Sequence, residues 1–414
     1  MSRARRLLIL AIVLGATAAL SLAISACGGS GDGTGGSSGG ESSSAGEESE
    51  GSGSAVNPAL GETAGAKALI ERALKGSVYT SVENLEEATP EDFKSAATWT
   101  GPTSAPEVEE GKNLQIVVCL FGTACQTGGE AAKEAAEKMG WTAELIDGKG
   151  TPEGAAQGMA TALSKQPDGI VTVSIPEGQV SDKLAEAKAE GIPVVTIADA
   201  NEEHDGYDAF VTRQELETSM LEAWYAIADS NGKAKVVFLW DSGYQHLVEG
   251  LDLATKILEA CEGCKVLHTY SRTLATATNP TAMEQLTSSI LKRYGNEVEY
   301  ILTPYGFGVS PVLSAARTAG SDVKVLSKNA QSENLELVAA GEQTADFGSS
   351  IEWWGWAAID QLRRLIAGEE PLPDAKEGLS LRAFNVSNAP ADGEVDWLDP
   401  VNFKAEYEKI WGVK

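Results

Sequence analysis

The stretch GIVTVSIPEGQVSDKLAEAKAEGIPVVTIAD, residues 169–199, contains two apolar runs on either side of a helical pattern. The runs GIVTVSI and IPVVTIAD are almost continuously apolar, which is typical of strands buried on both faces. Between them, GQVSDKLAEAKAEG has the spacing of an amphipathic helix. Two strands joined by a helix form a β-α-β unit, so the stretch predicts a parallel sheet covered on both faces.

The alternation of strands and helices continues on both sides of this stretch. It begins with the strand pattern LQIVVCLF at 114–121, and it restarts with the helix pattern LETSMLEAWYAIADSNG at 216–232. We therefore predict an α/β fold of two similar lobes with parallel sheets. Lobe 1 comprises 113–212, and 213–414 forms lobe 2 and closing elements, some of which return to lobe 1. The cleft between two such lobes is the expected ligand site, because ligands of open α/β sheets bind at the ends of the strands.

Composition and motifs argue against two classes of function. The chain has 414 residues and 60 acids against 32 bases, so its net charge of -28 disfavours nucleic-acid binding. It contains no HExxH, no G-x-S-x-G and no P-loop, and GKGTPEG at 148–154 lacks the glycine spacing of a dinucleotide-binding loop. We therefore predict a protein that is not an enzyme and uses no cofactor.

The N-terminus has the pattern of an export signal. Arg3, Arg5 and Arg6 precede the apolar run LLILAIVLGATAALSLAISA. The run ends in Ile-Ser-Ala before Cys27, and small residues before a cysteine resemble the bacterial lipobox. This resemblance implies that 1–26 is a lipoprotein signal peptide and that Cys27 is lipidated. The run is also long enough to span a bilayer, so an uncleaved anchor remains an alternative, as does a cleaved signal without lipid.

Two segments separate Cys27 from the first lobe. Residues 28–54 contain only Gly, Ser, Glu, Asp, Thr and Ala, so we expect 27–54 to be a disordered tether. Residues 55–112 include the helical pattern GAKALIERALKG and many turn residues. We interpret 55–112 as a leader segment that packs loosely against the two lobes and has no chemistry of its own.

The remaining cysteines form two short-range pairs, Cys119 with Cys125 and Cys261 with Cys264. In an exported chain this spacing predicts two local disulfides. His268 follows the second pair at a metal-ligand spacing, but three ligands without a fourth make only a weak zinc site. The loop NEEHDGYD around His204 is better explained as an exposed charged loop. We therefore predict no metal site.

Three stretches are similar to a known family: QPDGIVTVSIP, AKAEGIPVVTIAD and KVLSKNAQSENLELVAAGEQTADFGSSIEWWGWAAIDQLRRLIAGEEP. In this order they resemble the type I periplasmic binding proteins, the ribose- and galactose-binding-like receptors of bacterial ABC importers. The resemblance covers about residues 113–412. It implies two Rossmann-like lobes that close on a small polar solute, and three hinge crossings. From the order of the predicted strands, we expect these crossings near 210–213, 347–351 and 380–384. VVCLFGTACQTG is also similar to a subgroup with two cysteines in the first loop, which supports the Cys119–Cys125 disulfide.

The resemblance also implies a set of ligand-binding residues at the strand ends. In lobe 1, Asp199 is placed to accept sugar hydroxyls and Phe121 is placed to stack on a sugar ring. The other lobe 1 candidates are Thr123, Ser174 and Glu177. The lobe 2 candidates are Asp241, Tyr244, His246, Tyr305 with Phe307, Asn329, Ser350 and Trp353.

The second lobe departs from the pentose-binding pattern. SKNA places Asn329 where an acid is usual, TPYGFG replaces a frequent Asn-Asp, and DSGYQHL lacks an arginine. Fewer acids and more aromatic residues leave a cyclic polyol, a modified sugar or an aromatic solute as alternatives to a simple sugar.

These observations together predict a monomeric, lipid-anchored solute-binding protein on the outer face of the cell membrane. We expect it to deliver a small sugar-like molecule to an ABC permease. A sensory receptor of the same fold, which presents its bound molecule to a membrane sensor, is the alternative. Repressors share this fold, but the signal, the lipidation cysteine and the acidity argue against a DNA-binding role.

Overall fold

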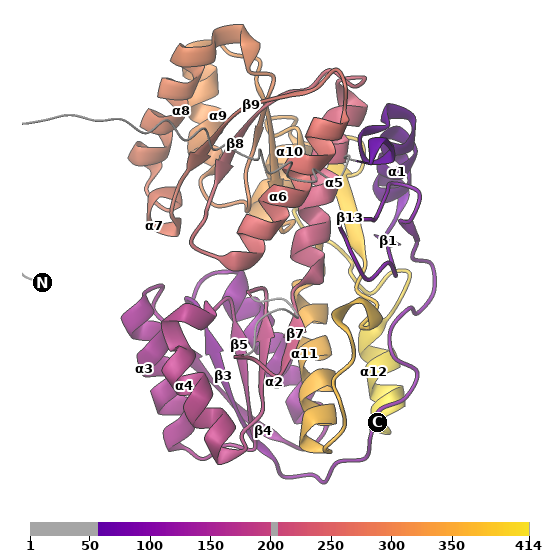
Figure 1. The fold of residues 1–414 in the computed structure, drawn as a ribbon, viewed down its shortest axis with the longest axis vertical. Coiled ribbons are helices and arrows are strands. Elements are labelled where there is room, and N and C mark those ends of the chain that lie inside the picture. Colours follow the sequence, from indigo (N-terminus) through magenta and orange to yellow (C-terminus); the bar gives the residue numbers. More distant parts are fainter. Residues whose placement is uncertain (1–56, 200–205, 414) are drawn as a thin grey trace, which may run out of the picture. The chain divides into compact units, whose positions relative to one another are not determined.

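The computed structural model describes residues 57–199 and 206–413 (Figure 1). The predicted signal peptide, the predicted lipidation site Cys27, the predicted tether and His204 lie outside these ranges. No helix within them is long and apolar enough to cross a membrane.

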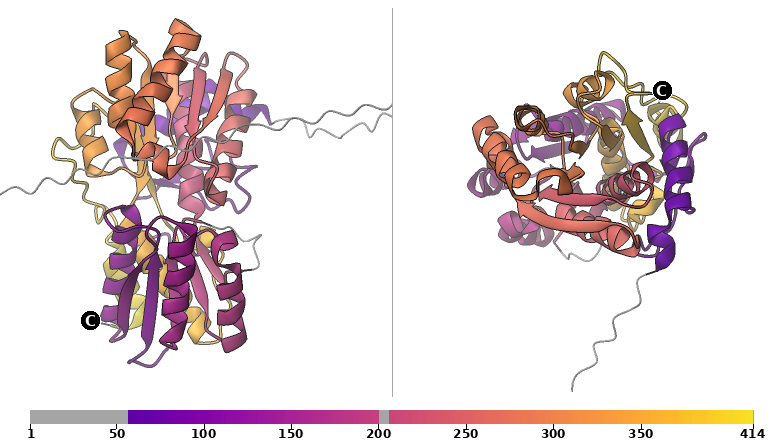
Figure 2. Two further views of the ribbon diagram at one scale, coloured as in Figure 1. Left: turned by 90° about the vertical axis from the view of Figure 1, so that its left-hand side faces the viewer. Right: turned by 90° about the horizontal axis from the view of Figure 1, so that it is seen from above.

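Lobe 1 contains a five-stranded parallel sheet in the order β4-β3-β5-β6-β7. Its strands are β3 (Asn113–Val118), β4 (Thr142–Asp147), β5 (Gly169–Val173), β6 (Val194–Ile197) and β7 (Ala209–Val211). One face is covered by α2 (Ala124–Lys138) and α11 (Ile351–Ile366), and the other by α3 (Pro152–Ser164) and α4 (Glu177–Glu190) (Figures 1 and 2). The predicted apolar runs are therefore buried strands between two helical layers.

Lobe 2 contains an eight-stranded sheet in the order β2-β1-β13-β12-β11-β10-β8-β9. Its parallel strands are β8 (Lys235–Trp240), β9 (Lys265–Ser271), β10 (Tyr300–Leu302), β11 (Lys324–Lys328) and β12 (Ala345–Ser349). Antiparallel pairing adds β13 (Leu381–Asn385), β1 (Val78–Tyr79) and β2 (Lys94–Ser95). The helices are α5 (Arg213–Asp229), α6 (Gln245–Ala260), α7 (Leu274–Ala277), α8 (Pro280–Tyr294), α9 (Val309–Ala319) and α10 (Ser332–Ala339). This architecture confirms the predicted α/β class.

The segment before lobe 1 differs from the loose leader expected from the sequence. Its first elements are η1 (Pro58–Gly61) and α1 (Thr63–Lys75), and α1 packs on α5. Leu69 and Phe93 are fully buried in the lobe 2 core, and the Phe93 ring packs edge-on against Trp224 at 5.3 Å between centroids. The apolar side of α1 and the pairing of β1 with β13 therefore make residues 57–95 part of lobe 2. Farther along the segment, Trp99, Ala105 and Val108 pack against the lobe 1 core.

The chain passes between the lobes at or beside the three segments predicted as hinges. It does so between β7 and α5, between β12 and α11, and between α11 and β13. The segment from β2 to β3 crosses as well, as does the segment from β13 to α12 (Phe403–Trp411). The aromatic side chains of α12 lie in the lobe 1 core, so a late element does return to the first lobe.

Disulfide bonds join Cys119 to Cys125 and Cys261 to Cys264. The first connects the end of β3 to the first turn of α2, and the second connects the end of α6 to the start of β9. His268 packs edge-on against Tyr270, with 4.5 Å between ring centroids. Within the described ranges, no group of three or more His, Cys, Asp and Glu residues is arranged to hold a metal ion.

Candidate functional site

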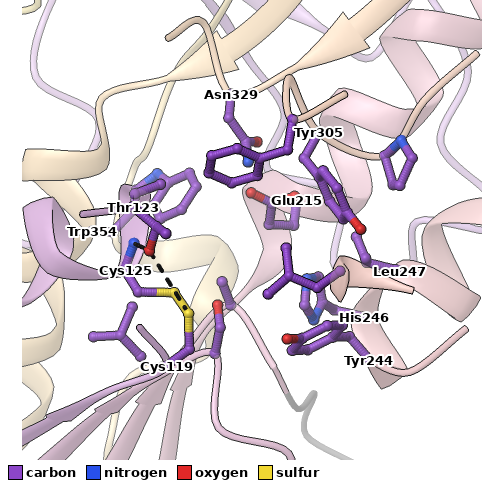
Figure 3. Close-up of a pocket in the computed structure, with 17 residues that line it drawn as sticks. Cys119, Thr123, Cys125, Glu215, Tyr244, His246, Leu247, Tyr305, Asn329 and Trp354 are labelled. Atoms are coloured by element: carbon purple, nitrogen blue, oxygen red, sulfur yellow. Dashed lines mark hydrogen bonds between the residues drawn. A yellow bond between two sulfur atoms is a disulfide. The ribbon is translucent and has the colours of Figure 1, made fainter. Parts of the chain in front are cut away.

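A cavity lies between the lobes at the carboxyl ends of their strands (Figure 3). It is bounded by residues of both lobes and by one tryptophan of α11. Its lining residues are Cys119, Thr123, Ala124, Cys125, Val173, Ser174, Ala198, Glu215, Tyr244, His246, Leu247, Leu274, Pro304, Tyr305, Phe307, Asn329 and Trp354. Apolar and aromatic side chains therefore form most of its wall, with a few polar groups between them.

Backbone turns at the strand ends bring three of these residues to the cavity. Ser174, Ala198 and Asn329 follow β5, β6 and β11, and their φ angles are 50°, 53° and 84°. Each donates its amide hydrogen to the neighbouring strand, at 2.8, 3.0 and 2.7 Å respectively. The left-handed conformation, which is costly for residues other than glycine, then turns the chain away from the sheet at the cavity wall.

Two aromatic side chains of the wall have their polar atoms bound behind them. The indole nitrogen of Trp354 donates to the Ser349 hydroxyl. The Tyr305 hydroxyl donates to Asp241 Oδ2 at 2.8 Å, and the Arg272 guanidinium lies 4.4 Å from the centre of the Tyr305 ring. These contacts fix the rings, so their carbon surfaces are available to a solute.

A buried ion pair lies at the lobe 2 side of the cavity. Glu215, in the first turn of α5, receives a hydrogen bond from Lys328 Nζ at 3.2 Å from Oε2. The same ammonium donates to the Glu215 carbonyl at 3.1 Å and to Ser219 Oγ at 2.9 Å. The Lys328 side chain is wholly buried, so water and salt screen the attraction between the two charges less than they would at the surface.

His246 adds a neutral polar group. It is 5% exposed, and its Nδ1 has no hydrogen-bond partner among the described residues. Burial, with a smaller effect from the charge of Lys328, lowers the imidazole pKa to about 3, so the ring is uncharged at neutral pH. The His246 amide donates to the Asp199 carbonyl at 3.1 Å, which is a direct bond between the lobes.

Comparison with protein families gives a match to the periplasmic binding protein domain over residues 122–370. The chain belongs to this family. The match confirms the resemblance seen in the sequence. Proteins of this family are extracytoplasmic solute-binding proteins and not enzymes. A search of curated proteins finds no match.

Solved structures share the fold of this periplasmic binding protein. An ABC sugar transporter subunit from Rhodobacter sphaeroides has a TM-score of 0.59 and 20% identity, over 67% of this chain and 99% of that one. A solute-binding protein from Bacillus halodurans with bound myo-inositol has a TM-score of 0.58 and 14% identity, over 69% and 98%. One from Agrobacterium vitis with bound allitol has a TM-score of 0.60 and 17% identity, over 68% and 97%. At these identities the likeness shows the fold alone.

Seven of the predicted ligand residues line the cavity of this periplasmic binding protein, and six do not. The lining set is Thr123, Ser174, Tyr244, His246, Tyr305, Phe307 and Asn329. The set outside the lining is Phe121, Glu177, Asp199, Asp241, Ser350 and Trp353. A ligand role for the second set remains a prediction from the resemblance.

The residues outside the lining have other neighbours. Phe121 is 43% exposed on the loop after β3. Ser350 accepts the Trp353 amide at 3.2 Å and so caps α11. The Trp353 ring is stacked between Trp99 and Phe403, with centroids 5.6 and 5.0 Å away. These contacts place Trp353 in the lobe 1 core.

Asp199 lies directly after a lining residue but is 1% exposed. Its Oδ2 accepts the Glu177 amide at 3.2 Å, and its Oδ1 has no partner among the described residues. Burial raises the pKa of the Asp199 carboxyl to about 8, and the nearby charges of Glu177 and Glu249 act in the same direction. The carboxyl is therefore mainly protonated at neutral pH.

Sequence reasoning missed Glu215 and Trp354. The predicted ligand residues lie mainly in loops that follow strands, whereas Glu215 lies in the first turn of α5, the helix after the crossing from β7. The signal for Glu215 was an acid at the start of a helix beside a predicted hinge. For Trp354, the signal was the pair Trp353–Trp354, whose side chains diverge by about 100° around a helix.

Proposed function

We propose that this protein is a lipid-anchored, extracytoplasmic solute-binding protein that captures a small sugar-like molecule and delivers it to an ABC permease. The observation that supports this most is the lining of the cavity by strand ends of both lobes. A solute in this position contacts both lobes at once, and such contacts favour the closed state over the open one.

The chemistry of the wall favours a cyclic, uncharged solute with hydroxyl groups. Trp354, Tyr305 and Phe307 offer carbon surfaces that suit the C–H faces of a ring, and Ser174 and Asn329 offer hydrogen-bonding groups. The proteins from Bacillus halodurans and Agrobacterium vitis were solved with myo-inositol and allitol, which are a cyclic and an acyclic polyol. A cyclic polyol or a modified sugar is therefore our first candidate.

The anchor is proposed from the sequence alone. The small residues before Cys27, the basic start of the chain and the Gly/Ser-rich tether favour lipidation over a retained helix.

A thermal-shift screen of the purified protein tests the binding function. The panel contains pentoses, hexoses, myo-inositol, allitol, nucleosides, amino acids and small aromatic acids. A solute that binds only the native state raises the melting temperature with concentration, and a hundredfold excess over Kd adds about 2.7 kcal/mol. We expect such a rise for at least one sugar or polyol.

Two adjacent tryptophans provide matched variants for this screen. Trp354→Ala removes part of the cavity wall, so it should abolish most of the ligand-induced shift. Trp353→Ala leaves a void in the lobe 1 core, so it should lower the melting temperature without solute but keep the shift. A panel in which no sugar or polyol raises the melting temperature would contradict the proposed ligand class.

A further inference from the structure

Glu215 is the one cavity-lining residue among those described whose side chain carries a formal charge at neutral pH. Its Oε2 is bound to the buried Lys328 ammonium, whereas its Oε1 accepts no hydrogen bond from any described residue. The Glu215 side chain is 4% exposed, and it lies among the cavity side chains in Figure 3. Oε2 of the Glu215 carboxylate is therefore bound to Lys328, and Oε1 is available to accept a hydrogen bond from a bound molecule.

The charge of this carboxylate is already balanced. Lys328 Nζ makes three hydrogen bonds, all to Glu215 and Ser219, and no part of its side chain is exposed. Lys328 thus cannot reach a solute directly. Its role is to hold Glu215 in position and to offset its negative charge, which makes it a positioning residue.

The other ionisable groups next to the cavity present no charged side chain to a bound solute. His246 is neutral, and burial raises the pKa of the Glu222 carboxyl well above its usual value. Glu222 does not line the cavity, and its Oε1 accepts the Thr303 amide. Arg272 lies behind the Tyr305 ring, where it donates to the Phe307 carbonyl at 2.8 Å. No described cation lines the cavity.

We propose that Glu215, positioned by Lys328, accepts hydrogen bonds from solute hydroxyl groups and restricts the cavity to uncharged polyhydroxylated rings. An anionic solute meets a carboxylate and no cation, so it loses its hydration without compensation. A cationic solute meets a carboxylate that Lys328 already neutralises, so it leaves a net charge in a buried site. This inference rests on the proposed binding function and adds its specificity-determining residue.

A matched charge series tests the restriction. Isothermal titration calorimetry compares D-glucose with D-glucuronate and D-glucosamine, and D-galactose with D-galacturonate and D-galactosamine. We add myo-inositol as a ring without an anomeric centre. The neutral member of the better-bound series should bind at least about tenfold more tightly than both charged members, a ratio equivalent to 1.4 kcal/mol. A uronate or an amino sugar that binds as well as its neutral parent would overturn the proposal.

Variants test the two residues separately. Glu215→Gln should weaken binding of the best neutral ligand by about tenfold to a hundredfold, the range for a hydrogen bond to a charged group. Glu222→Gln is the control on the same helix. Because Glu222 lies outside the lining, its variant should bind like the unmodified protein. Equal affinities of Glu215→Gln and Glu222→Gln would also overturn the proposal.

Lys328→Met provides a readout that a purely structural role would not change. It leaves the Glu215 charge uncompensated, so the preference should shift from the neutral sugar toward the amino sugar. Should this variant fail to fold, the charge-balanced double variant Glu215→Gln with Lys328→Met should fold and bind as weakly as Glu215→Gln alone. Uniform loss of all ligands would contradict the proposed charge compensation of Glu215 by Lys328. If no sugar, polyol or charged analogue binds the unmodified protein, the proposed ligand class fails and this inference fails with it.

Discussion

Asp199 is buried under the cavity wall with a carboxyl pKa of about 8, compared with its usual 3.8. A raised pKa in the folded state means that folding favours the protonated form. The stability that this group contributes is therefore complete below about pH 3.8 and is lost as the pH rises through 8. Asp199→Asn is neutral throughout, so its free energy of unfolding relative to the unmodified protein should increase from pH 4 to pH 8. Urea unfolding at pH 4, 6 and 8 measures this difference.

Asp182→Asn, on the exposed side of α4, is the control for this series. Its stability should follow that of the unmodified protein at each pH. Parallel curves for the Asp199 and Asp182 variants would contradict the raised pKa.

At the residue scale, the sequence could predict which strand ends approach the cavity but not every side chain that lines it. Asn329 and Ser174 follow strands directly, so the strand pattern is enough to place them. Asp199 also follows a strand, yet the left-handed turn at Ala198 and the bond to the Glu177 amide place its carboxyl outside the lining. Glu215 depends on a partner 113 residues away in sequence, Lys328, and no local pattern reveals such a pair.

At the scale of elements, the segment before lobe 1 completes the lobe 2 core. Phe93 is fully buried against Trp224, so Phe93→Ala should lower the free energy of unfolding by about 3–5 kcal/mol. Lys94→Ala, at the exposed neighbouring position, should change it by less than about 0.5 kcal/mol. Equilibrium urea unfolding measures both. A loss below about 1 kcal/mol for Phe93→Ala would restore the expectation of a loosely packed leader.

The strand and helix pattern predicted the parallel core of both lobes, because continuous apolar runs are a strong local signal. The short strands β1 and β2 carried no such signal. Each has two residues, and β1 exists because it pairs with β13, about 300 residues later in the chain. Pairing at this distance depends on the assembled sheet edge and not on local composition.

At the scale of the whole molecule, Asp374 joins two of the segments that connect the lobes. It lies between α11 and β13, in η3 (Asp374–Lys376), and its Oδ2 accepts the amides of Thr212 and Arg213, each at 2.7 Å. Arg213 in turn donates to the carbonyls of Val82 and Glu83. The start of α5, the approach to β13 and the segment before lobe 1 are therefore held together at the hinge.

Because these segments are bonded to one another, they must bend together when the lobes separate. Asp374→Ala removes the shared acceptor, so the solute-free protein should open further and its radius of gyration in small-angle X-ray scattering should increase. The solute-bound protein should keep the same radius of gyration, because the solute contacts hold both lobes. Wider opening makes closure more costly, so solute affinity should fall. Glu370→Ala, at an exposed side chain shortly before η3, is the control and should leave both values unchanged. Equal radii of gyration for the solute-free Asp374 and Glu370 variants would show that the lobes bend independently of the Asp374 hydrogen bonds.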